Sequence, residues 1–222
     1  MTGANHSWPL LEQPLRLEEI RTSLRDGTPV LVRPVRPDDR EIIRASFARL
    51  SPESRYFRFM TPVSALSEAQ LDYLTKLDFV DHVAWLAVRA DHPEEGIGVA
   101  RFVRTKADPT IAEAAVTVID DYQGRGLGTL LLALLATVAR AVGVVTFRAY
   151  VIQHNARMRN LLEPLGARTT LDSPGVLRMD VDLDPGHLPD SPPARVLRAA
   201  AQRMLGPITG PSDLPDAEGP RS

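Results

Sequence analysis

The sequence has no cysteine among its 222 residues and no strong excess of charge of either sign. The absence of cysteine excludes a disulfide framework, a thiolate metal site and a cysteine acyl carrier. The formal net charge of −2 and the isoelectric point near 6.2 give no basic field of the kind used to bind nucleic acid. The five histidines are scattered without metal-ligand spacing, so we expect no bound metal.

Long hydrophobic runs are missing as well. The most apolar stretch, residues 130–145, contains Arg140 and falls short of the roughly 20 apolar residues that a bilayer requires, which favours a buried helix. Residues 1–14 lack the basic start and apolar core of a signal peptide. With 44% hydrophobic and 24% charged residues, the composition predicts a soluble cytoplasmic protein with one core and no membrane contact.

The most informative segment is residues 123–129 (QGRGLGT), between a strand-like stretch at 112–119 and an apolar helix expected over 127–142. Glycines let a turn adopt positive φ and let a ligand approach the main chain, while the free N–H groups of a helix start favour negative charge. The segment therefore predicts an anion site. A P-loop does not fit, because its last glycine is followed by lysine and then serine or threonine, whereas Gly128 is followed by Thr129 and Leu130. A dinucleotide fingerprint would lie earlier in the chain.

A second block follows downstream. Residues 146–152 are predicted to form a strand, and residues 155–162 a helix that Asn155 caps and Gly166 terminates. Together with the Gln-x-x-Gly-x-Gly spacing, this block resembles the acyl-coenzyme A signature of GNAT-type N-acetyltransferases. The matched motifs cover residues 108–167, and a weaker likeness in layout extends back to residue 24. The alternative is a tight turn that binds nothing.

The resemblance implies an α/β (α+β) fold with a mixed, mostly antiparallel, twisted sheet, splayed at the acyl-CoA site and flanked by helices. It also implies acetyl-CoA as the acyl donor, with its pyrophosphate held by main-chain amides of the glycine turn and no metal. The residues expected at the cofactor are Val116, Thr117, Val118, Gln123, Gly124, Arg125, Gly126, Leu127, Gly128, Thr129 and Asn155. Arg157 and Arg159 are further candidates for the outer phosphate, with exposed surface charges as the alternative.

Residues 24–56 are most similar to the bacterial protein lysine acetyltransferases, without the regulatory domain that some members carry. By that resemblance Glu113 is the catalytic base. A lysine amine has an ordinary pKa of about 10.4 and is protonated at neutral pH, so a group must remove its proton before it attacks a thioester. The period of two places Glu113 on the strand face opposite Val116 and Val118. A solvent-facing glutamate without a catalytic role is the alternative.

Two classes of function follow. The first is an N-acetyltransferase that uses acetyl-CoA, with a protein lysine as the favoured acceptor and a small-molecule amine as the alternative. The second is a non-catalytic acyl-CoA-binding sensor module. The general acid for the leaving thiolate is unassigned, because Leu162 stands where many family members have tyrosine. We interpret Asp120 and Asp121 as a solvated loop end, and His82 as a structural residue at a strand start.

The chain divides into a partly flexible lead (residues 1–23), an acetyltransferase domain (24–183) and a proline-rich tail (184–222). A short helix is predicted within the lead, at 17–24, and another within the tail, at 194–205. The tail helix is a candidate to dock on its own domain or on a second copy, which would make a homodimer, with a frayed surface helix as the alternative. The remaining expected elements are a strand at 29–34, a helix at 38–50, helices that begin at Ser51 and Ser67, and a hairpin of strands 83–90 and 96–105.

Overall fold

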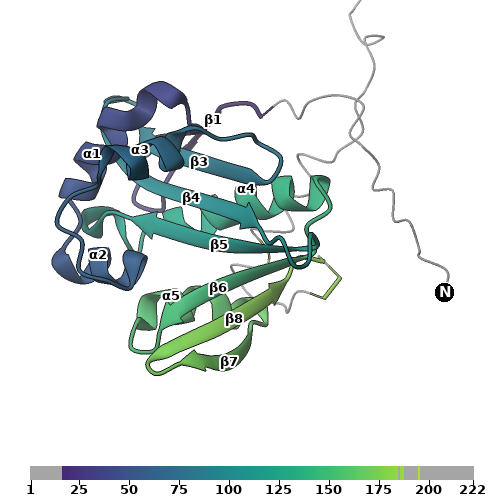
Figure 1. Ribbon diagram of the computed structural model, residues 1–222. Helices are drawn as coiled ribbons and strands as arrows, with labels where there is room; N and C mark the ends of the chain where they lie inside the picture. Colours follow the sequence, from purple (N-terminus) through teal and green to yellow (C-terminus); the bar gives the residue numbers. More distant parts are fainter. Residues whose placement is uncertain (1–16, 185, 188–194, 196–222) are drawn as a thin grey trace, which may run out of the picture.

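A computed structural model describes residues 17–184, 186–187 and 195, and contains an eight-stranded sheet with helices on both faces (Figure 1). The strand order is β1-β2-β3-β4-β5-β6-β8-β7. The strands are β1 (Ile20–Ser23), β2 (Pro29–Pro34), β3 (His82–Arg89), β4 (Gly96–Arg104), β5 (Ile111–Val118), β6 (Thr146–Ile152), β7 (Arg168–Ser173) and β8 (Val176–Asp182). The helices are α1 (Arg40–Ala48), α2 (Pro52–Phe59), α3 (Glu68–Thr75), α4 (Leu127–Ala141) and α5 (Ala156–Leu162), with short 3-10 helices η1 (Pro37–Asp39), η2 (Asp120–Tyr122) and η3 (Glu163–Leu165).

Neighbouring strands are antiparallel except for β5 and β6, which run parallel and are connected through α4. This mixed, mostly antiparallel sheet confirms the fold class expected from the sequence. The parallel ladder is short: its pairs are Ile111 with Thr146, Ala112 with Phe147, and Glu113 with Arg148. Beyond Glu113 the two strands separate, and the gap between their ribbons widens in Figure 1.

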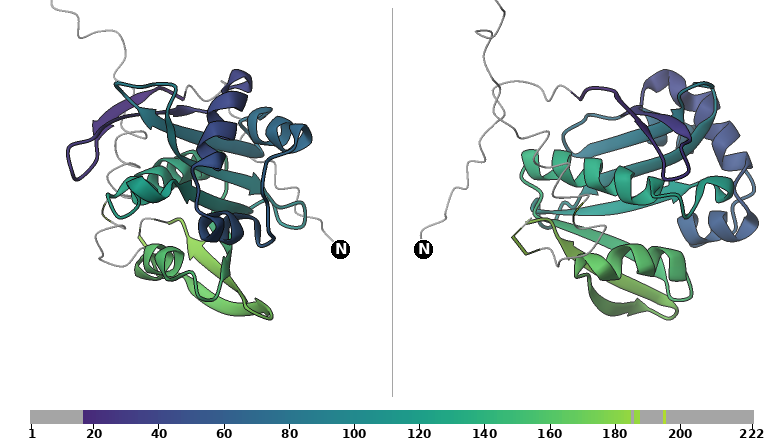
Figure 2. Two further views of the ribbon diagram at one scale, coloured as in Figure 1. Left: turned by 90° about the vertical axis from the view of Figure 1, so that its left-hand side faces the viewer. Right: turned by 180° about the vertical axis from the view of Figure 1, so that it is seen from behind.

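The helices form two layers around the sheet. Helix α4 packs on β3, β4 and β5, and the view from behind in Figure 2 shows α4 and α5 on the same side of the sheet. Helix α1 contacts β4 and α3 on the opposite face. The long apolar segment of α4 is buried as expected, at Leu127 and from Leu131 to Ala139, against a core that includes Trp85 and Phe102.

Local sequence signals set the helix boundaries. The Ser51 hydroxyl accepts a hydrogen bond from the Ser54 amide at the start of α2. Ser67 and Gln70 form the reciprocal capping box that begins α3. The Asn155 side chain accepts from the Met158 amide, and Gly166 has a φ of 79°, so both ends of the α5–η3 segment follow the sequence expectation.

The prediction of a helix at residues 17–24 is wrong. Ile20–Ser23 is strand β1, which pairs with β2, and its side chains alternate between half-buried and exposed positions. Pairing with the sheet edge outweighs the helix propensity of this short segment. The hairpin of β7 and β8 has no counterpart among the predicted elements. The tail helix predicted at 194–205 lies outside the described residues apart from position 195.

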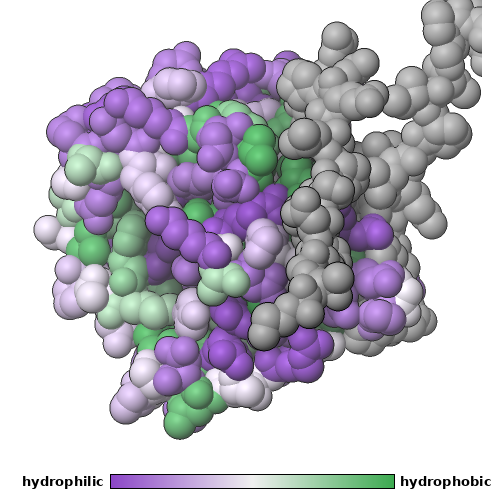
Figure 3. Space-filling view, turned by 45° about the vertical axis from the view of Figure 1, so that its right-hand side comes forward, coloured by the Kyte–Doolittle hydropathy of each residue, from purple (hydrophilic) through white to green (hydrophobic). Residues whose placement is uncertain are grey.

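None of the helices in the described ranges is long and apolar enough to cross a membrane. The face shown in Figure 3 is largely hydrophilic, with hydrophobic residues in small groups.

A buried ion pair fixes the segment that leads from β2 into α1. Arg33, which is 7% exposed, donates to both carboxylate oxygens of Asp39, which is 2% exposed, at 2.8 and 2.6 Å. The Asp39 carboxylate also accepts from the Arg36 amide at 2.7 Å. The hydrogen bonds from Arg33 to Asp39 raise the pKa of Arg33 further, so the guanidinium stays charged. Asp39 therefore neutralises a charge that cannot reach water.

Asp39→Ala should lower the free energy of unfolding by about 3–5 kcal/mol, because it leaves the Arg33 guanidinium buried and unpaired. Urea denaturation followed by circular dichroism measures the change. Asp38→Ala is the matched control, since Asp38 is the preceding residue and is exposed. Equal, small losses in the two variants would show that the pair does not stabilise the fold.

Candidate active site

The glycine turn connects the end of β5 to the start of α4. Gly124 and Gly126 have φ values of 75° and 91°, a region that side chains other than glycine rarely adopt. Gly126 is the N-cap residue of α4, and no side chain caps this helix start. The first amides of α4 therefore lack intrahelical acceptors and are available to an anion. The Gln123 side-chain amide donates to the Val118 carbonyl at 2.9 Å, which ties the turn to the end of β5.

A groove of about 790 Å³ lies against this turn, and its volume is in the range typical of ligand sites. Its walls come from β5, the turn, β6, α5 and α2. Most of the expected site residues line it: Glu113, Val116, Thr117, Val118, Gln123, Gly124, Gly126, Gly128, Thr129 and Asn155. The separation of β5 from β6 thus opens onto the glycine turn.

Two of the expected cofactor residues do not line the groove. Arg125 donates to the Asp26 carboxylate at 2.5 Å, and its guanidinium lies over the Tyr122 ring at 5.0 Å. Leu127 is 1% exposed and belongs to the core. Their side chains therefore hold the turn in place, and only their main-chain groups belong to it.

Other cations lie at the groove. Arg25, from the turn between β1 and β2, lines it, and the Arg25 amide donates to the Arg125 carbonyl at 3.2 Å. Arg157 lines it from α5 with a largely exposed side chain. Arg159, in contrast, pairs with Glu163 at 2.9 Å. The sequence analysis missed Arg25, because nothing local in the sequence marks its contact with a turn 100 positions further along.

Asp120 is not the solvated loop end that we expected. Its carboxylate accepts hydrogen bonds from the Ser51 amide, the Ser51 hydroxyl and the Ser54 hydroxyl at 2.8–3.0 Å. Partial burial by itself raises the pKa of Asp120, but these hydrogen bonds outweigh it and hold the pKa below its ordinary value. Asp121 is exposed, as predicted. Asp120 thus connects the residues before the glycine turn to the start of α2.

Glu113 lies on the same face of β5 as Ala115 and Thr117, opposite the face of Val116 and Val118, as the period of two predicted. The same face of β4 carries Arg101, which pairs with Ala115 in the antiparallel register. Glu113 itself is exposed and lies at the groove. Its carboxylate interacts electrostatically with the guanidinium of Arg58 from α2. The last residue of β5 that pairs with β6 is therefore an acidic side chain near an arginine.

A smaller cavity of about 70 Å³ adjoins the groove, and the two share Arg58, Phe59, Ala115 and Thr117 in their walls. Arg101 also lines this cavity and is 4% exposed. One of its terminal nitrogens donates to the Leu74 carbonyl at 3.1 Å, while its Nε and its other terminal nitrogen are buried without a hydrogen-bond partner. Burial, and then repulsion from Arg58, lowers the pKa of Arg101 to about 10, so it remains a cation at neutral pH.

His82 and Tyr73 lie beside Arg101, outside the walls of the cavity and of the groove. Their rings lie 4.8 Å apart, and the guanidinium of Arg101 lies 5.3 Å from the Tyr73 ring centre. The Nε2 atom of His82 is buried without a hydrogen-bond partner. Burial, and then the charge of Arg101, lowers the pKa of His82 to about 4, so the imidazole is neutral at pH 7.

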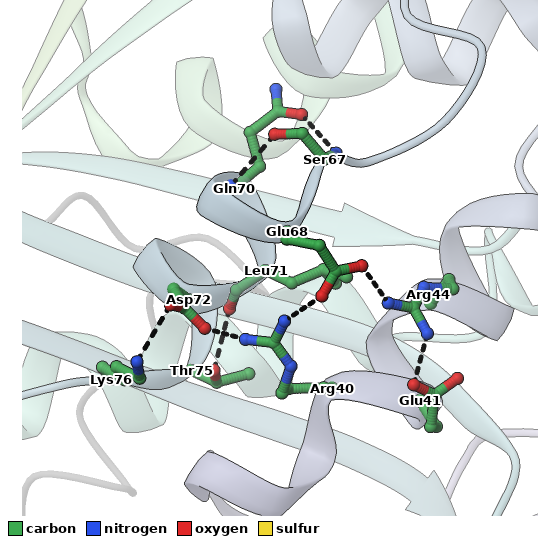
Figure 4. Close-up of polar contacts among 10 residues, drawn as sticks. All are labelled: Arg40, Glu41, Arg44, Ser67, Glu68, Gln70, Leu71, Asp72, Thr75 and Lys76. Atoms are coloured by element: carbon green, nitrogen blue, oxygen red, sulfur yellow. Dashed lines mark hydrogen bonds and ion pairs between the residues drawn. The ribbon is translucent and has the colours of Figure 1, made fainter.

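An ion-pair network joins α1 to α3, the helix that carries Tyr73 (Figure 4). Arg40 pairs with Asp72 and Glu68, and Arg44 pairs with Glu68 at 2.7 Å. Lys76 adds a pair with Asp72 at 2.9 Å. Single exposed pairs contribute little, but several charges joined in one network fix geometry better. Helix α3 is thereby oriented with Tyr73 against Arg101.

Within the described part of the chain, no cluster of three or more histidine, aspartate or glutamate side chains could hold a metal ion. The polar groups that face the groove are thus main-chain amides, a carboxylate, amide and hydroxyl side chains, and arginines. This set suits a phosphorylated ligand and proton transfer from a second molecule.

Comparisons with known proteins identify the family of the chain. Residues 30–168 match the family described as the acetyltransferase (GNAT) domain. The chain is 38% identical over 166 residues to acetyltransferase Pat of Mycolicibacterium smegmatis, covering 75% of this chain and 49% of that protein. It is 39% identical over 145 residues to acetyltransferase PA5475 of Pseudomonas aeruginosa, covering 65% and 77%. The crystal structure of the GNAT domain of S. lividans PAT matches with a TM-score of 0.69 and 34% identity, over 74% of this chain and 96% of that one. The chain thus spans about half the length of the M. smegmatis protein.

His82→Gln should reduce the loss of stability between pH 7 and pH 5. The unfolded chain binds a proton at His82 below its ordinary pKa of 6.5, whereas the folded protein does so only near pH 4. His82 therefore lowers stability progressively as the pH falls from 6.5 toward 4. Thermal melts at the two pH values, compared between wild type and variant, isolate this contribution from those of other groups. His92→Gln, at an exposed loop position, is the control. An unchanged pH dependence in His82→Gln would contradict the assignment.

Proposed function

The chain belongs to the GNAT acetyltransferase family, and we propose that it transfers an acetyl group from acetyl-CoA to an amine, with Glu113 as the general base. The observation that carries the proposal is the groove itself, which begins at the end of the β5–β6 ladder and joins Glu113 to the glycine turn. A donor and a proton acceptor are both needed for acyl transfer to an amine, and this groove has room for one beside the other.

In this proposal the donor binds along the glycine turn. The pyrophosphate of acetyl-CoA accepts hydrogen bonds from the amides of residues 124–129, and Arg25 and Arg157 add positive charge at the rim. The acetyl group lies along residues 116–118, whose main-chain groups on the β6 side have no strand partner. A main-chain amide there donates to the thioester oxygen as negative charge develops on it.

The acceptor enters beside Glu113. The Glu113 carboxylate takes a proton from the ammonium, directly or through a water, and the free amine attacks the thioester carbon. The nitrogen of the tetrahedral intermediate loses its second proton to solvent as the C–S bond breaks, which leaves the neutral acetylated amine and the coenzyme A thiolate. Solvent protonates the thiolate, since a thiol with an ordinary pKa of about 8.5 is a tolerable leaving group. Leu162, at the position where the family often has a tyrosine, is 4% exposed and has no proton to give.

We favour a protein lysine as the acceptor, because residues 24–56 are most similar to the bacterial protein lysine acetyltransferases. The identity to the Pat protein of M. smegmatis supports this placement within the family. A cytoplasmic location stays a prediction from composition alone. A homodimer formed through the tail also stays a prediction.

Incubation of a cell lysate with isotope-labelled acetyl-CoA and this protein, followed by mass spectrometry, tests the acceptor class. We expect the label on lysine side chains, above the level in a lysate without the protein. Label on N-termini or on small amines alone would overturn the lysine assignment and leave the acetyltransferase assignment intact.

Glu113→Gln should lower kcat/KM for the amine by about 10²–10⁴-fold and leave the affinity for coenzyme A unchanged, because the amide cannot accept the proton. Coenzyme A release and calorimetric titration measure the two quantities. Glu94→Gln, in an exposed loop, is the control and should behave as wild type. Transfer by Glu113→Gln at the wild-type rate would remove Glu113 as the base. Coenzyme A binding by the wild-type protein without transfer to any amine would instead favour a sensor module.

Gly126→Ala should weaken coenzyme A binding by at least about tenfold, because a side chain strains the backbone at its φ of 91° and the new Cβ would lie 3.3 Å from the Nε atom of Arg25. Gly175→Ala is the matched control, since Gly175 has a φ of 79° in the β7–β8 turn with nothing near its Cβ position. Both variants should lose similar stability, but only Gly126→Ala should lose affinity. Equal affinities in the two variants would show that the turn does not contact the cofactor.

A further inference from the structure

Arg101 is a buried cation without a counter-ion. It is 4% exposed, it forms no ion pair with any described residue, and two of its guanidinium nitrogens are buried without a hydrogen-bond partner. Removing a charge from water is costly unless an opposite charge or a full set of acceptors replaces the water. Arg33, the other buried arginine of the described residues, has both: a bidentate carboxylate and an additional carbonyl acceptor. Only Arg101 faces a cavity instead.

The charge around this cavity does not balance. Arg58 and Arg101 both line it, and their guanidinium groups repel each other, while Glu113 is the carboxylate that attracts Arg58. His82 is neutral at pH 7 and adds no charge. Two cations against one carboxylate leave a single positive charge unmatched. A water molecule in the cavity could accept hydrogen bonds from Arg101, but it would not neutralise that charge.

The position of Arg101 relative to Glu113 makes this surplus relevant to the acceptor. Arg101 pairs with Ala115, and Glu113 lies two residues along β5 on the same face, which makes Arg101 and Glu113 diagonal neighbours. Side chains so placed start roughly 7–8 Å apart. The cavity and the groove adjoin at the lining residues that they share. A molecule whose amine reaches Glu113 in the groove can therefore extend a second group into the cavity toward Arg101.

We propose that the cavity lined by Arg58 and Arg101 is an anion subsite for the acceptor, so that the preferred substrates are amines that carry a carboxylate several bonds away on the same molecule. This inference rests on the proposed acetyl transfer and specifies its acceptor. The carboxylate is held by the open guanidinium edge of Arg101, in a cavity that Arg58 also lines. The source of the carboxylate is either the α-carboxylate of a free amino acid or an acidic side chain next to a lysine in a peptide.

A matched pair of small acceptors tests the subsite. Nα-acetyl-lysine and Nα-acetyl-lysinamide offer the same ε-amine, with and without a carboxylate. We expect the wild-type protein to have a kcat/KM at least about tenfold higher for the carboxylate, mostly through KM, because a charge-assisted bidentate contact is lost in the amide. A second pair of amidated peptides, with glutamate or glutamine after the lysine, distinguishes a peptide source of the carboxylate from a free amino acid.

Arg101→Met should remove the preference, so that the two members of each pair react with equal kcat/KM. Arg178→Met, on β8 and outside the cavity walls, is the matched control and should keep the wild-type ratio. A preference that persists in Arg101→Met would show that Arg101 only anchors the Leu74 carbonyl.

The wild-type comparison needs no variant and decides the question even if Arg101→Met does not fold. Equal acetylation of both members of both pairs would overturn the anion subsite and leave the acetyltransferase assignment standing. If neither member of a pair is acetylated, calorimetric titration of both members onto the protein saturated with coenzyme A decides instead. Tighter binding of the carboxylate supports the subsite without transfer, and equal or no binding overturns it.

Discussion

Three residue pairs hold β5 against β6, and the rest of the site depends on where that pairing stops. Beyond Glu113, the main-chain groups of β5 on the β6 side have no strand partner, although β4 still pairs with β5 on its other edge. Buried main-chain groups require hydrogen-bond partners, so an opening of this kind is stable only where solvent or a ligand can enter. The same break sets Glu113 beside the groove and leads to the glycine turn of residues 124–129.

The two buried arginines differ in how their charges are compensated. Arg33 is neutralised within the chain by Asp39, in the connection that positions α1. Arg101 is left with open donors toward a cavity that Leu74 of α3 lines, and α3 is joined to α1 by ion pairs. A fold selected for stability alone would place an apolar side chain at such a position, since a well-packed hydrophobic residue avoids the cost of desolvation. The retained charge therefore points to a ligand rather than to the core.

Local patterns in the sequence predicted the parts of the fold that depend on short-range physics. The caps at Ser51, Ser67 and Asn155 and the glycine turn before α4 depend on residues within a few positions of one another. Strand β1 depends on pairing with the adjacent strand β2, and the contact of Arg25 with the glycine turn joins segments 100 residues apart; periodicity encodes neither. Arg101 looks like any strand arginine in the sequence. Only the register of β4 on β5 places it beside Glu113.

The most direct test of this account is a titration of isotope-labelled protein with coenzyme A, followed by amide chemical shifts in two-dimensional NMR spectra. The account predicts the largest shifts at residues 124–129 and 116–118, with β7 and β1 unaffected. Saturating shifts confined to other surfaces, with the glycine turn unchanged, would contradict it.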